Sequence, residues 1–434
     1  MYLLYSVVLA LLGLAYLPVF LVRKVWRAGY PLALAERLGF VPLQPGPDRF
    51  WVHAVSVGEV MAAVPLVHAL RQRWPDTEVV VSTVTPTGAR VARTRLPEAT
   101  ATFAFPLDLG PATARAVRRV RPRCFIALET ELWPNVLRTL AADGTPAILV
   151  NGRISDRSFR RYAWVRPLFR RVLDHVALFC MQSDEDARRI ISLGAHPERV
   201  VVTGNLKMEA PEGLEGAEQL WRRLLHLGPA RVWIAGSTHH GEEGPILDAF
   251  VALREELRGS PEPLCLILAP RHPERVDEVE ALGRARGLPP VRRSRIGPGG
   301  PNEVILLDTV GELATLYAVA EVIFVGGSLV PAGGHNVIEA ALHAKPIVFG
   351  PHMTNFRDAA ALLLRARGAF QIRDAGELLP TLRTLLADAA ARRRLGEAAW
   401  SAVRAHQGAC QRTVEALEGL LERGVGSQDP AAPA

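Results

Sequence analysis

Carboxylate side chains follow two apolar runs in the first half of the chain, where they could take part in proton transfer. Glu59 ends the segment HAVSVGE, which starts at His53, and Glu129 and Glu131 follow the run Cys124–Leu128. A carboxylate at the end of a buried strand can accept a proton from an attacking hydroxyl and act as a general base. Glu59 should lie in the first turn of a helix, whose dipole favours the ionised carboxylate. We therefore expect a base that is ready to accept a proton.

The same carboxylates also have a structural explanation. Ser56 and Glu59 have the spacing of a capping box, in which two side chains close hydrogen bonds at a helix N-terminus. Glu129 and Glu131 precede Trp133 and could cap a helix that starts there. The local sequence leaves both explanations open.

Basic residues at the ends of two further apolar runs suit a phosphorylated leaving group. Lys207 ends the segment GNLK, and Arg271 follows Pro270 after the run Leu264–Ala269. A guanidinium binds two phosphate oxygens at once, and a lysine at the end of a strand can reach into a ligand site. We expect both cations to neutralise a phosphate.

A glycine-rich loop in the second half indicates a nucleotide site. It follows the buried run Val322–Val325, contains four glycines between positions 326 and 334, and leads into a helix at His335 or Asn336. Free N–H groups and the positive end of a helix dipole suit a phosphate, and Glu339 could accept hydrogen bonds from ribose hydroxyls. The loop matches neither GxGxxG nor GxxxxGK[ST], so a purely structural turn is the alternative.

Two other segments begin helices after apolar runs. The turn Val310-Gly311-Glu312 could offer N–H groups to a base or a phosphate. His239 and His240, in the segment STHHGEE, raise the alternative of a metal site. Adjacent histidines point apart and no fourth ligand is evident, so we favour a capped helix start and expect no metal.

The elements that must carry these residues alternate between strand and helix. Helix-length segments such as Glu59–Trp74 separate short apolar runs. The predicted strands of the first half are Phe50–Val55, Val79–Thr83, Ala101–Phe105, Cys124–Leu128, Ala147–Val150, Leu178–Gln182 and Val200–Thr203. Those of the second half are Val232–Ala235, Leu264–Ala269, Val304–Leu307, Val322–Val325 and Ile347–Phe349. This alternation predicts two Rossmann-like α/β domains that face a central cleft, with ligands at the carboxyl ends of the strands.

Three less regular segments complete this description. Leu206–Gly228 is polar and predicted to be helical, Val291–Asn302 is predicted to be a surface loop, and Ala390–Arg423 is predicted to be a helical tail.

The N-terminus is predicted to anchor the chain in a membrane. Its first 22 residues carry no charge, and as a helix they would be about 33 Å long, enough to cross a bilayer core of about 30 Å. Arg23, Lys24 and Arg27 follow, which places the rest of the chain on the cytoplasmic side. A buried or surface-lying helix is the alternative, because Gly13 and Pro18 interrupt the span.

The composition fits a globular protein with an anionic partner. Of the 434 residues 49% are hydrophobic, and the net charge is +7. The arginines form no aromatic-interleaved motif, so we expect no nucleic acid and favour an anionic membrane surface or substrate. Four widely spaced cysteines without a CxxC pair argue against a zinc knuckle and a disulfide framework.

Motifs along most of the chain resemble those of a known enzyme family. They occur in order between about Trp51 and Asp358: HAVSVGE, TVTPTG, ETELWPN, NGRIS, TGNLK, STHHGEE, APRHPER, DTVGEL, FVGGSLVPAGGHNVIEA and FGPHMTNF. Together they are similar to the bacterial 3-deoxy-D-manno-octulosonic acid (Kdo) transferases of lipopolysaccharide assembly. The resemblance implies an inverting GT-B glycosyltransferase that transfers Kdo from CMP-Kdo to lipid IVA at the inner membrane, on its cytoplasmic side. No cofactor or metal is expected.

The resemblance also implies roles for individual residues. Glu59 is similar to the general base of the family, and Glu129 and Lys207 match positions that support the transition state. The CMP-binding segments of the family match Pro270 and Arg271, Val310, Gly311 and Glu312, and Asn336, Val337, Ile338 and Glu339.

Six segments are predicted on this basis. They are a hydrophobic membrane anchor (1–22), a basic and Pro-rich linker (23–47), an N-terminal acceptor domain (48–210), a C-terminal nucleotide-sugar domain (211–405), a helix that crosses back (406–423) and a disordered tail (424–434). Two other functions stay open: a GT-B transferase that uses a UDP-sugar, and a membrane-tethered nucleotide-binding protein without catalysis. A dehydrogenase is disfavoured because no dinucleotide fingerprint follows the first strand of either half.

Overall fold

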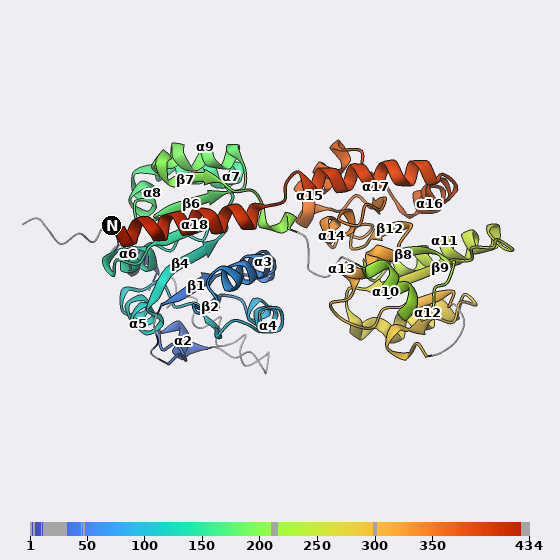
Figure 1. Ribbon diagram of the computed structural model, residues 1–434, viewed down its shortest axis with the longest axis horizontal. Helices are drawn as coiled ribbons and strands as arrows, with labels where there is room; N and C mark the ends of the chain where they lie inside the picture. The colour runs from blue at the N-terminus through green and yellow to red at the C-terminus, as the bar shows by residue number, and fades with distance from the viewer. Residues whose placement is uncertain are drawn as a thin grey trace, which may run out of the picture. The chain divides into compact units, whose positions relative to one another are not determined.

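The computed structural model describes residues 2, 5–9, 11, 33–44, 46, 48–209, 216–297 and 302–426. They form two compact units, each an α/β domain with its own parallel sheet (Figure 1). Unit 1 contains the described residues up to Glu209 and those from Gln407 onward, and unit 2 contains those in between. The prediction of two Rossmann-like domains is confirmed, whereas the predicted cleft between them stays a prediction. Most of the predicted anchor and residues 23–32 of the predicted linker lie outside the described residues. The tail predicted to be disordered begins within a helix that runs to Gly426, and the rest of the tail lies outside the described residues.

The sheet of unit 1 has seven parallel strands in the order β3-β2-β1-β4-β5-β6-β7. Their bounds are β1 (Arg49–His53), β2 (Glu78–Thr83), β3 (Ala101–Ala104), β4 (Pro122–Leu128), β5 (Ala147–Gly152), β6 (Leu178–Met181) and β7 (Val200–Val202). The order reverses between β1 and β4, and open α/β sheets bind ligands at such a point, beyond the carboxyl ends of the strands.

Helices cover both faces of this sheet (Figure 1). One apolar core joins the sheet to α5 (Gly110–Val120), α6 (Pro134–Ala142), α8 (Arg166–Leu173) and α9 (Asp184–Leu193). The other joins it to α3 (Val57–Arg73), α4 (Pro86–Arg95) and α18 (Ala409–Gly426). The helices α2 (Leu34–Arg37) and α7 (Asp156–Trp164) contribute no fully buried residue. Strands buried on both faces explain why the sequence shows continuous apolar runs instead of alternation.

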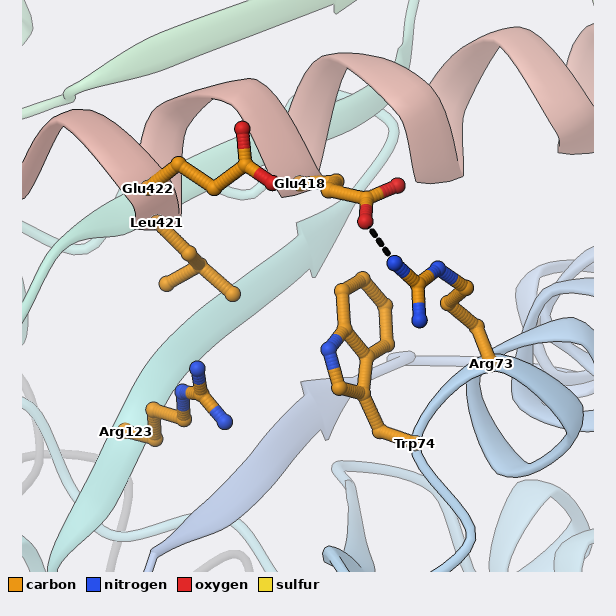
Figure 2. Close-up of a pocket in the computed structure, with 6 residues that line it drawn as sticks. All are labelled: Arg73, Trp74, Arg123, Glu418, Leu421 and Glu422. Carbon is orange, nitrogen blue, oxygen red and sulfur yellow. Dashed lines mark hydrogen bonds and ion pairs between the residues drawn. The ribbon is translucent and has the colours of Figure 1, made fainter.

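Helix α18 comes from the end of the chain and packs on α3. Its N-terminus is fixed to unit 1, since the N–H of Cys410 donates to Glu209 Oε1 at 2.8 Å. A hollow of about 350 Å³ lies beside α18. It is lined by Arg73, Trp74, Arg123, Glu418, Leu421 and Glu422, which are drawn in Figure 2. Arg73 forms an ion pair with Glu418 there. Arg123 lies at the amino end of β4, so this hollow is at the opposite edge of the sheet from the predicted carboxylate site.

The sheet of unit 2 also has seven parallel strands, in the order β10-β11-β9-β8-β12-β13-β14. Their bounds are β8 (Arg231–Thr238), β9 (Leu264–Pro270), β10 (Val291–Arg292), β11 (Val304–Leu306), β12 (Val322–Val325), β13 (Ile347–Phe349) and β14 (Ala369–Gln371). The helices are α10 (Ala217–Leu224), α11 (Glu243–Glu256), α12 (Val276–Arg284), α13 (Leu313–Leu316), α14 (Val337–Ala341), α15 (Arg357–Arg365), α16 (Leu378–Ala387) and α17 (Ala389–Arg404). The strand order reverses between β8 and β12, which is where the second ligand site is expected.

The structure corrects three local predictions. The segment Val291–Asn302 is not only a loop, because it contains β10. The helical tail is not continuous, because α17 ends at Arg404 and α18 begins at Ala409. Gly408 lies in the break between them and has a φ of 82°, which is typical of glycine. In the segment Leu206–Gly228, a short 3₁₀-helix η2 (Leu206–Met208) comes first, and α10 begins only at Ala217.

The described N-terminal residues are helical and lie against unit 1 with their polar side. The hydroxyl of Tyr2 is 2.7 Å from His175 Nε2, and Ser6 accepts a hydrogen bond from Asn135 Nδ2 at 3.0 Å. Val7 and Val8 are nearly half exposed on the other side. Within the described residues, no helix has both the length and the apolar character needed to cross a bilayer.

Candidate active site

Glu59 lies where β1 passes into α3, at the point where the strand order of unit 1 reverses. Its carboxylate is only 8% exposed and turns back toward the strand. The N–H of Val55 donates to Oε2 at 2.7 Å, and the hydroxyl of Ser56 donates to Oε1 at 3.2 Å. Ser56 itself makes no capping hydrogen bond, so the capping box does not form.

Burial raises the pKa of Glu59, and the neighbouring Glu129 carboxylate raises it further. The hydrogen bonds from Val55 and Ser56 and the charge of Lys207 act in the opposite direction, but they do not outweigh the loss of water. The predicted preference of Glu59 for the ionised form is therefore opposed by burial, although the backbone N–H of Val55 acts in the predicted direction. A base with a raised pKa is a stronger proton acceptor once it is ionised.

Glu129 and Lys207 form an ion pair beside Glu59. Glu129 directly follows β4 and has a φ of 56°, a left-handed conformation that turns the chain away from the strand direction. Its Oε1 is 2.6 Å from Lys207 Nζ, and both side chains are partly exposed. Lys207 lies in η2, after the edge strand β7, so the chain must return across the sheet to bring it there.

Asn151 holds that returning chain in place. It is fully buried near the end of β5, has a φ of 57°, and its Oδ1 accepts a hydrogen bond from the N–H of Leu206 at 3.0 Å. Asn151 begins the motif NGRIS, but the motif did not indicate a role for this side chain. An asparagine in a left-handed position is the signal that could have indicated a structural role for it, but the sequence alone does not reveal φ.

Glu131 completes the cluster. Burial first, and then the charges of Glu59 and Glu129, raise the pKa of Glu131 to about 7. The charges of Glu59 and Glu129 oppose ionisation of Glu131, so this carboxyl group holds a proton over part of the neutral pH range. The three residues predicted to be catalytic, Glu59, Glu129 and Lys207, are thus brought together at one edge of the sheet of unit 1.

In unit 2, the first half of the glycine loop is occupied by a side chain of the protein itself. The carboxylate of Glu242 is completely buried. It accepts hydrogen bonds from the N–H groups of His239 at 2.9 Å, Gly327 at 2.7 Å, Ser328 at 3.0 Å and Leu329 at 2.8 Å. The N–H groups of residues 327–329 are therefore engaged by the protein itself and are not free to bind a phosphate.

The helix after the loop, α14, is short. It ends at Ala341, and five residues produce only a small dipole. Asn336 caps it by accepting the N–H of Ile338 at 3.0 Å and donates to Glu339 Oε1 at 3.0 Å. Val337 and Ile338 have buried side chains, so only their backbone is available to a ligand.

The other predicted nucleotide residues lie at the same edge of the sheet of unit 2. Pro270 ends β9, and Arg271 has an exposed side chain that makes no ion pair with any described residue. After β11, the turn of Val310 and Gly311 leaves Val310 76% exposed, while Glu312 accepts a hydrogen bond from Thr309. His343 Nε2 lies 2.6 Å from the carbonyl oxygen of Ala314, which ties this turn region to the end of α14.

His239 and His240 do not start a helix, because α11 begins only at Glu243. His240 pairs with Glu278 at 2.9 Å on the surface. Among the residues that the structure describes, no group of three or more His, Cys, Asp or Glu side chains is arranged to hold a metal ion.

The fold has relatives among solved structures. The UDP-GlcNAc 2-epimerase from Neisseria meningitidis, bound to UDP-GlcNAc, matches 86% of this chain and all of its own, with a TM-score of 0.57 and 12% identity. At this identity the likeness concerns the fold alone, and it agrees with two Rossmann-like domains of GT-B type.

Sequence comparison identifies the family. Residues 33–210 match the family model of 3-deoxy-D-manno-octulosonic-acid transferase (kdotransferase). The chain is 34% identical to the 3-deoxy-D-manno-octulosonic acid transferase of Haemophilus influenzae over 91% of its length and 93% of that protein. It is 38% identical to the transferase of the same name from Bordetella pertussis over 95% of its length and 98% of that protein. The chain therefore belongs to the Kdo transferases, a family of glycosyltransferases.

Proposed function

We propose that this protein transfers Kdo from CMP-Kdo to lipid IVA, with inversion at the anomeric carbon, and that Glu59 is the general base. Membership in the Kdo transferase family gives the transferred sugar. The observation that carries the mechanism is the cluster of Glu59, Glu129 and Lys207 where the strand order of unit 1 reverses. It combines a poorly solvated base with a fixed cation at the edge of the sheet where α/β proteins bind ligands.

Glu59 would accept the proton of a sugar hydroxyl of the acceptor. The hydroxyl oxygen forms a bond to the anomeric carbon of Kdo from one side while the bond from that carbon to the phosphate oxygen of CMP breaks on the other. The raised pKa of Glu59 supports this role, since a general base acts best when its pKa approaches the working pH. The Lys207 ammonium, held by Glu129 at 2.6 Å, adds a fixed positive charge near the developing negative charges.

The nucleotide would bind at the carboxyl edge of the sheet of unit 2. Arg271 is exposed and is a suitable partner for a phosphate. The exposed Val310 offers an apolar contact to a base, and Asn336 and Glu339 offer polar groups to the ribose. Because Glu242 occupies residues 327–329, we assign the phosphate to side chains and not to that part of the loop.

An anionic membrane surface is the proposed site of action, on the cytoplasmic side of the inner membrane. Trp164, the last residue of α7, is 91% exposed, and its neighbours Val165 and Leu168 are each 46% exposed. Arginines 157, 160 and 161 on α7 and 166, 170 and 171 on α8 flank them. A tryptophan surrounded by arginines is typical of surfaces that enter the headgroup region of anionic lipids.

One assay tests this function. Purified protein is incubated with CMP-Kdo and lipid IVA, with and without EDTA, and the mass of the product counts the sugars added. We expect transfer that persists in EDTA, since the proposal assigns the neutralisation of the phosphate charge to the side chains of Lys207 and Arg271. Loss of turnover in EDTA would contradict the metal-free mechanism, and tighter binding of UDP or UMP than of CMP would contradict the donor.

The general base is tested by Glu59→Gln, which keeps the shape of the side chain but removes the proton acceptor. Transfer should fall by about 10²–10⁴-fold, the usual contribution of a positioned base, while the affinity for CMP stays unchanged. Glu397→Gln, at an exposed position of α17, is a matched control that should keep full activity. Normal transfer by the Glu59 variant would favour a different base.

A further inference from the structure

Three histidines gather over the carboxyl ends of the neighbouring strands β9, β8 and β12. His239 follows β8, His272 follows β9, and His335 ends the glycine loop after β12. The rings of His239 and His335 stack at 5.1 Å, with their Nε2 atoms 2.8 Å apart. The ring of His272 stands edge-on to His239 at 5.5 Å. This is the point in unit 2 where the strand order reverses, and no role has been assigned to these side chains so far.

The backbone holds this pair of histidines in position. A Cβ at Gly327 would lie 2.9 Å from His335 Cδ2 and 3.2 Å from His239 Cδ2, so the two rings occupy the space that a side chain would fill. Glu242 accepts the N–H groups of both His239 and Gly327, which fixes the loop against β8. The contact is therefore a built feature of the fold and not a chance approach of two surface side chains.

A short Nε2–Nε2 contact requires one donor and one acceptor. One imidazole carries the hydrogen and the other presents its lone pair, since two N–H groups would repel. Burial lowers the pKa of His239, and burial together with Arg271, His239 and His272 lowers the pKa of His335 to about 4. Both shifts favour the neutral form of the pair at pH 7 in the free protein.

The charges around the pair leave a place for an anion. Of the acidic groups that face it, Glu242 already accepts four N–H groups, and Glu243 pairs with Arg275 at 2.8 Å. The cationic group that faces it is Arg271, which is exposed and has no ion pair within the described part of the chain. The side of the pair that faces Arg271 and His272 therefore has positive charge without a negative partner.

We propose that His239 and His335 bind the phosphate of the nucleotide and take up one proton from solvent as they do so. This rests on the proposed function, and it adds two residues that lie outside the segments assigned to CMP above. A bound phosphate favours the charged imidazolium and so reverses the effects of burial and of Arg271. The imidazolium N–H then stabilises the charge that grows on the phosphate as its bond to the sugar breaks.

Calorimetry of CMP binding tests this site. CMP is titrated into the full chain at pH 8, where its free phosphate is ionised because its second pKa is about 6. Two buffers with different ionisation enthalpies give the number of protons taken up. We expect uptake of up to about one proton in the wild type and its loss in His335→Gln and His239→Gln. His240→Gln is the matched control: that side chain is 84% exposed, pairs with Glu278, and its variant should keep the wild-type uptake.

Two ligand controls separate the possible anions. Cytidine lacks the phosphate and should bind without proton uptake. Proton uptake with free Kdo but not with CMP would mean that the two histidines bind a carboxylate, and it would overturn the phosphate assignment. Unchanged uptake in a correctly folded His335 variant, as judged by circular dichroism, would also overturn it. If the wild type does not bind CMP, both proposals fail; if it binds CMP and transfers Kdo without proton uptake, only the histidine site fails.

Discussion

Glu59 and Glu131 are close together, yet they differ in what their surroundings supply. Glu59 has two hydrogen-bond donors, from Val55 and Ser56, which limit the effect of burial on its pKa. For Glu131, like charges on Glu59 and Glu129 act in the same direction as burial. Two carboxylates whose environments separate their pKa values can hold one proton between them, and the one with the lower pKa is then free to act as the base.

This difference predicts how stability depends on pH. The pKa of Glu131 is about 7 in the folded chain, whereas the ordinary pKa of a glutamate is 4.5, so the folded state binds more protons than the unfolded state between these values. Stability is therefore highest near pH 4.5 for this group and falls as the pH rises through about 7. The full shift corresponds to about 3 kcal/mol, and partial exposure reduces this to about 1–2 kcal/mol.

The variant Glu131→Gln should remove this contribution. At pH 8 it should unfold at a higher denaturant concentration than the wild type, whereas at pH 5 the two should be nearly equal. Urea unfolding at both pH values measures the difference. Glu185→Gln, at an exposed residue near the start of α9, is the control for the loss of one carboxylate. A Glu131 variant that is less stable at pH 8 would mean that the carboxylate is stabilised by a partner.

For individual residues, the sequence predicted which side chains form the candidate site, but not their pKa shifts or hydrogen-bond partners. Glu59, Glu129 and Lys207 could be named because each stands at the end of an apolar run. The raised pKa of Glu59 could not be predicted, because it depends on how much water the fold removes. Glu242 was not recognised, since nothing in STHHGEE shows that its carboxylate turns toward a loop more than eighty residues later.

At the scale of the elements, the glycine loop of unit 2 resembles a phosphate-binding loop, but a carboxylate of the protein itself accepts hydrogen bonds from its N–H groups. Glu242 places Oε2 on the N–H groups of His239 and Gly327 and Oε1 on those of Ser328 and Leu329. Four donors on one carboxylate compensate the cost of burying its charge. The loop therefore owes its shape to a side chain of α11's N-cap position, and a bound nucleotide is not needed to form it.

Replacing Glu242 with Gln should destabilise unit 2. The new NH₂ group would face two N–H donors that lose their acceptor, at a cost of about 2–5 kcal/mol. The melting temperature should fall by roughly 5–15 °C, as expected for a domain of this size, and calorimetry measures it. Glu274→Gln, on an exposed side chain nearby, is the matched control. Equal melting temperatures for the Glu242 variant and the wild type would mean that the loop finds another acceptor.

The α7–α8 corner carries the prediction about membranes. Trp164 is 91% exposed and buries nothing in the fold, so Trp164→Ser should leave the melting temperature unchanged. It should weaken binding to vesicles that contain anionic lipids by roughly tenfold, since burying this area in the interface stabilises binding by about 1–2 kcal/mol. Phe370→Ser, a 43% exposed residue of β14, is the control. Co-sedimentation that does not distinguish the two variants would remove this corner from the membrane surface.

Over the whole molecule, the alternation of strand and helix was enough to predict two parallel sheets. Each strand in the predicted list is present, because strands buried on both faces appear as continuous apolar runs. The strands β10 and β14 were missed, since two or three residues at a sheet edge produce no recognisable pattern. Periodicity also could not predict which unit α18 joins, because an apolar stripe on a helix does not show which surface will cover it.

That last element decides whether unit 1 can fold without the end of the chain. Ala409, Cys410, Val414 and Leu417 of α18 are buried in the same core as Val60, Leu66 and Leu70 of α3. At about 1.5–3 kcal/mol each for Val414 and Leu417, and about 1 kcal/mol each for the smaller Ala409 and Cys410, their loss amounts to roughly 5–8 kcal/mol, which is comparable to the whole stability of a domain.

A chain that stops after His406 should therefore keep a folded unit 2 and lose unit 1. Its calorimetric trace should lack one transition, and limited proteolysis should cut first within residues 48–209. A chain that stops after Gly426 keeps all of α18 and is the matched control, which should behave as the full-length protein does. If the shorter chain keeps both transitions and resists cleavage in this region, α3 must be stabilised by its own sheet, and the packing of α18 would then contribute little to the fold.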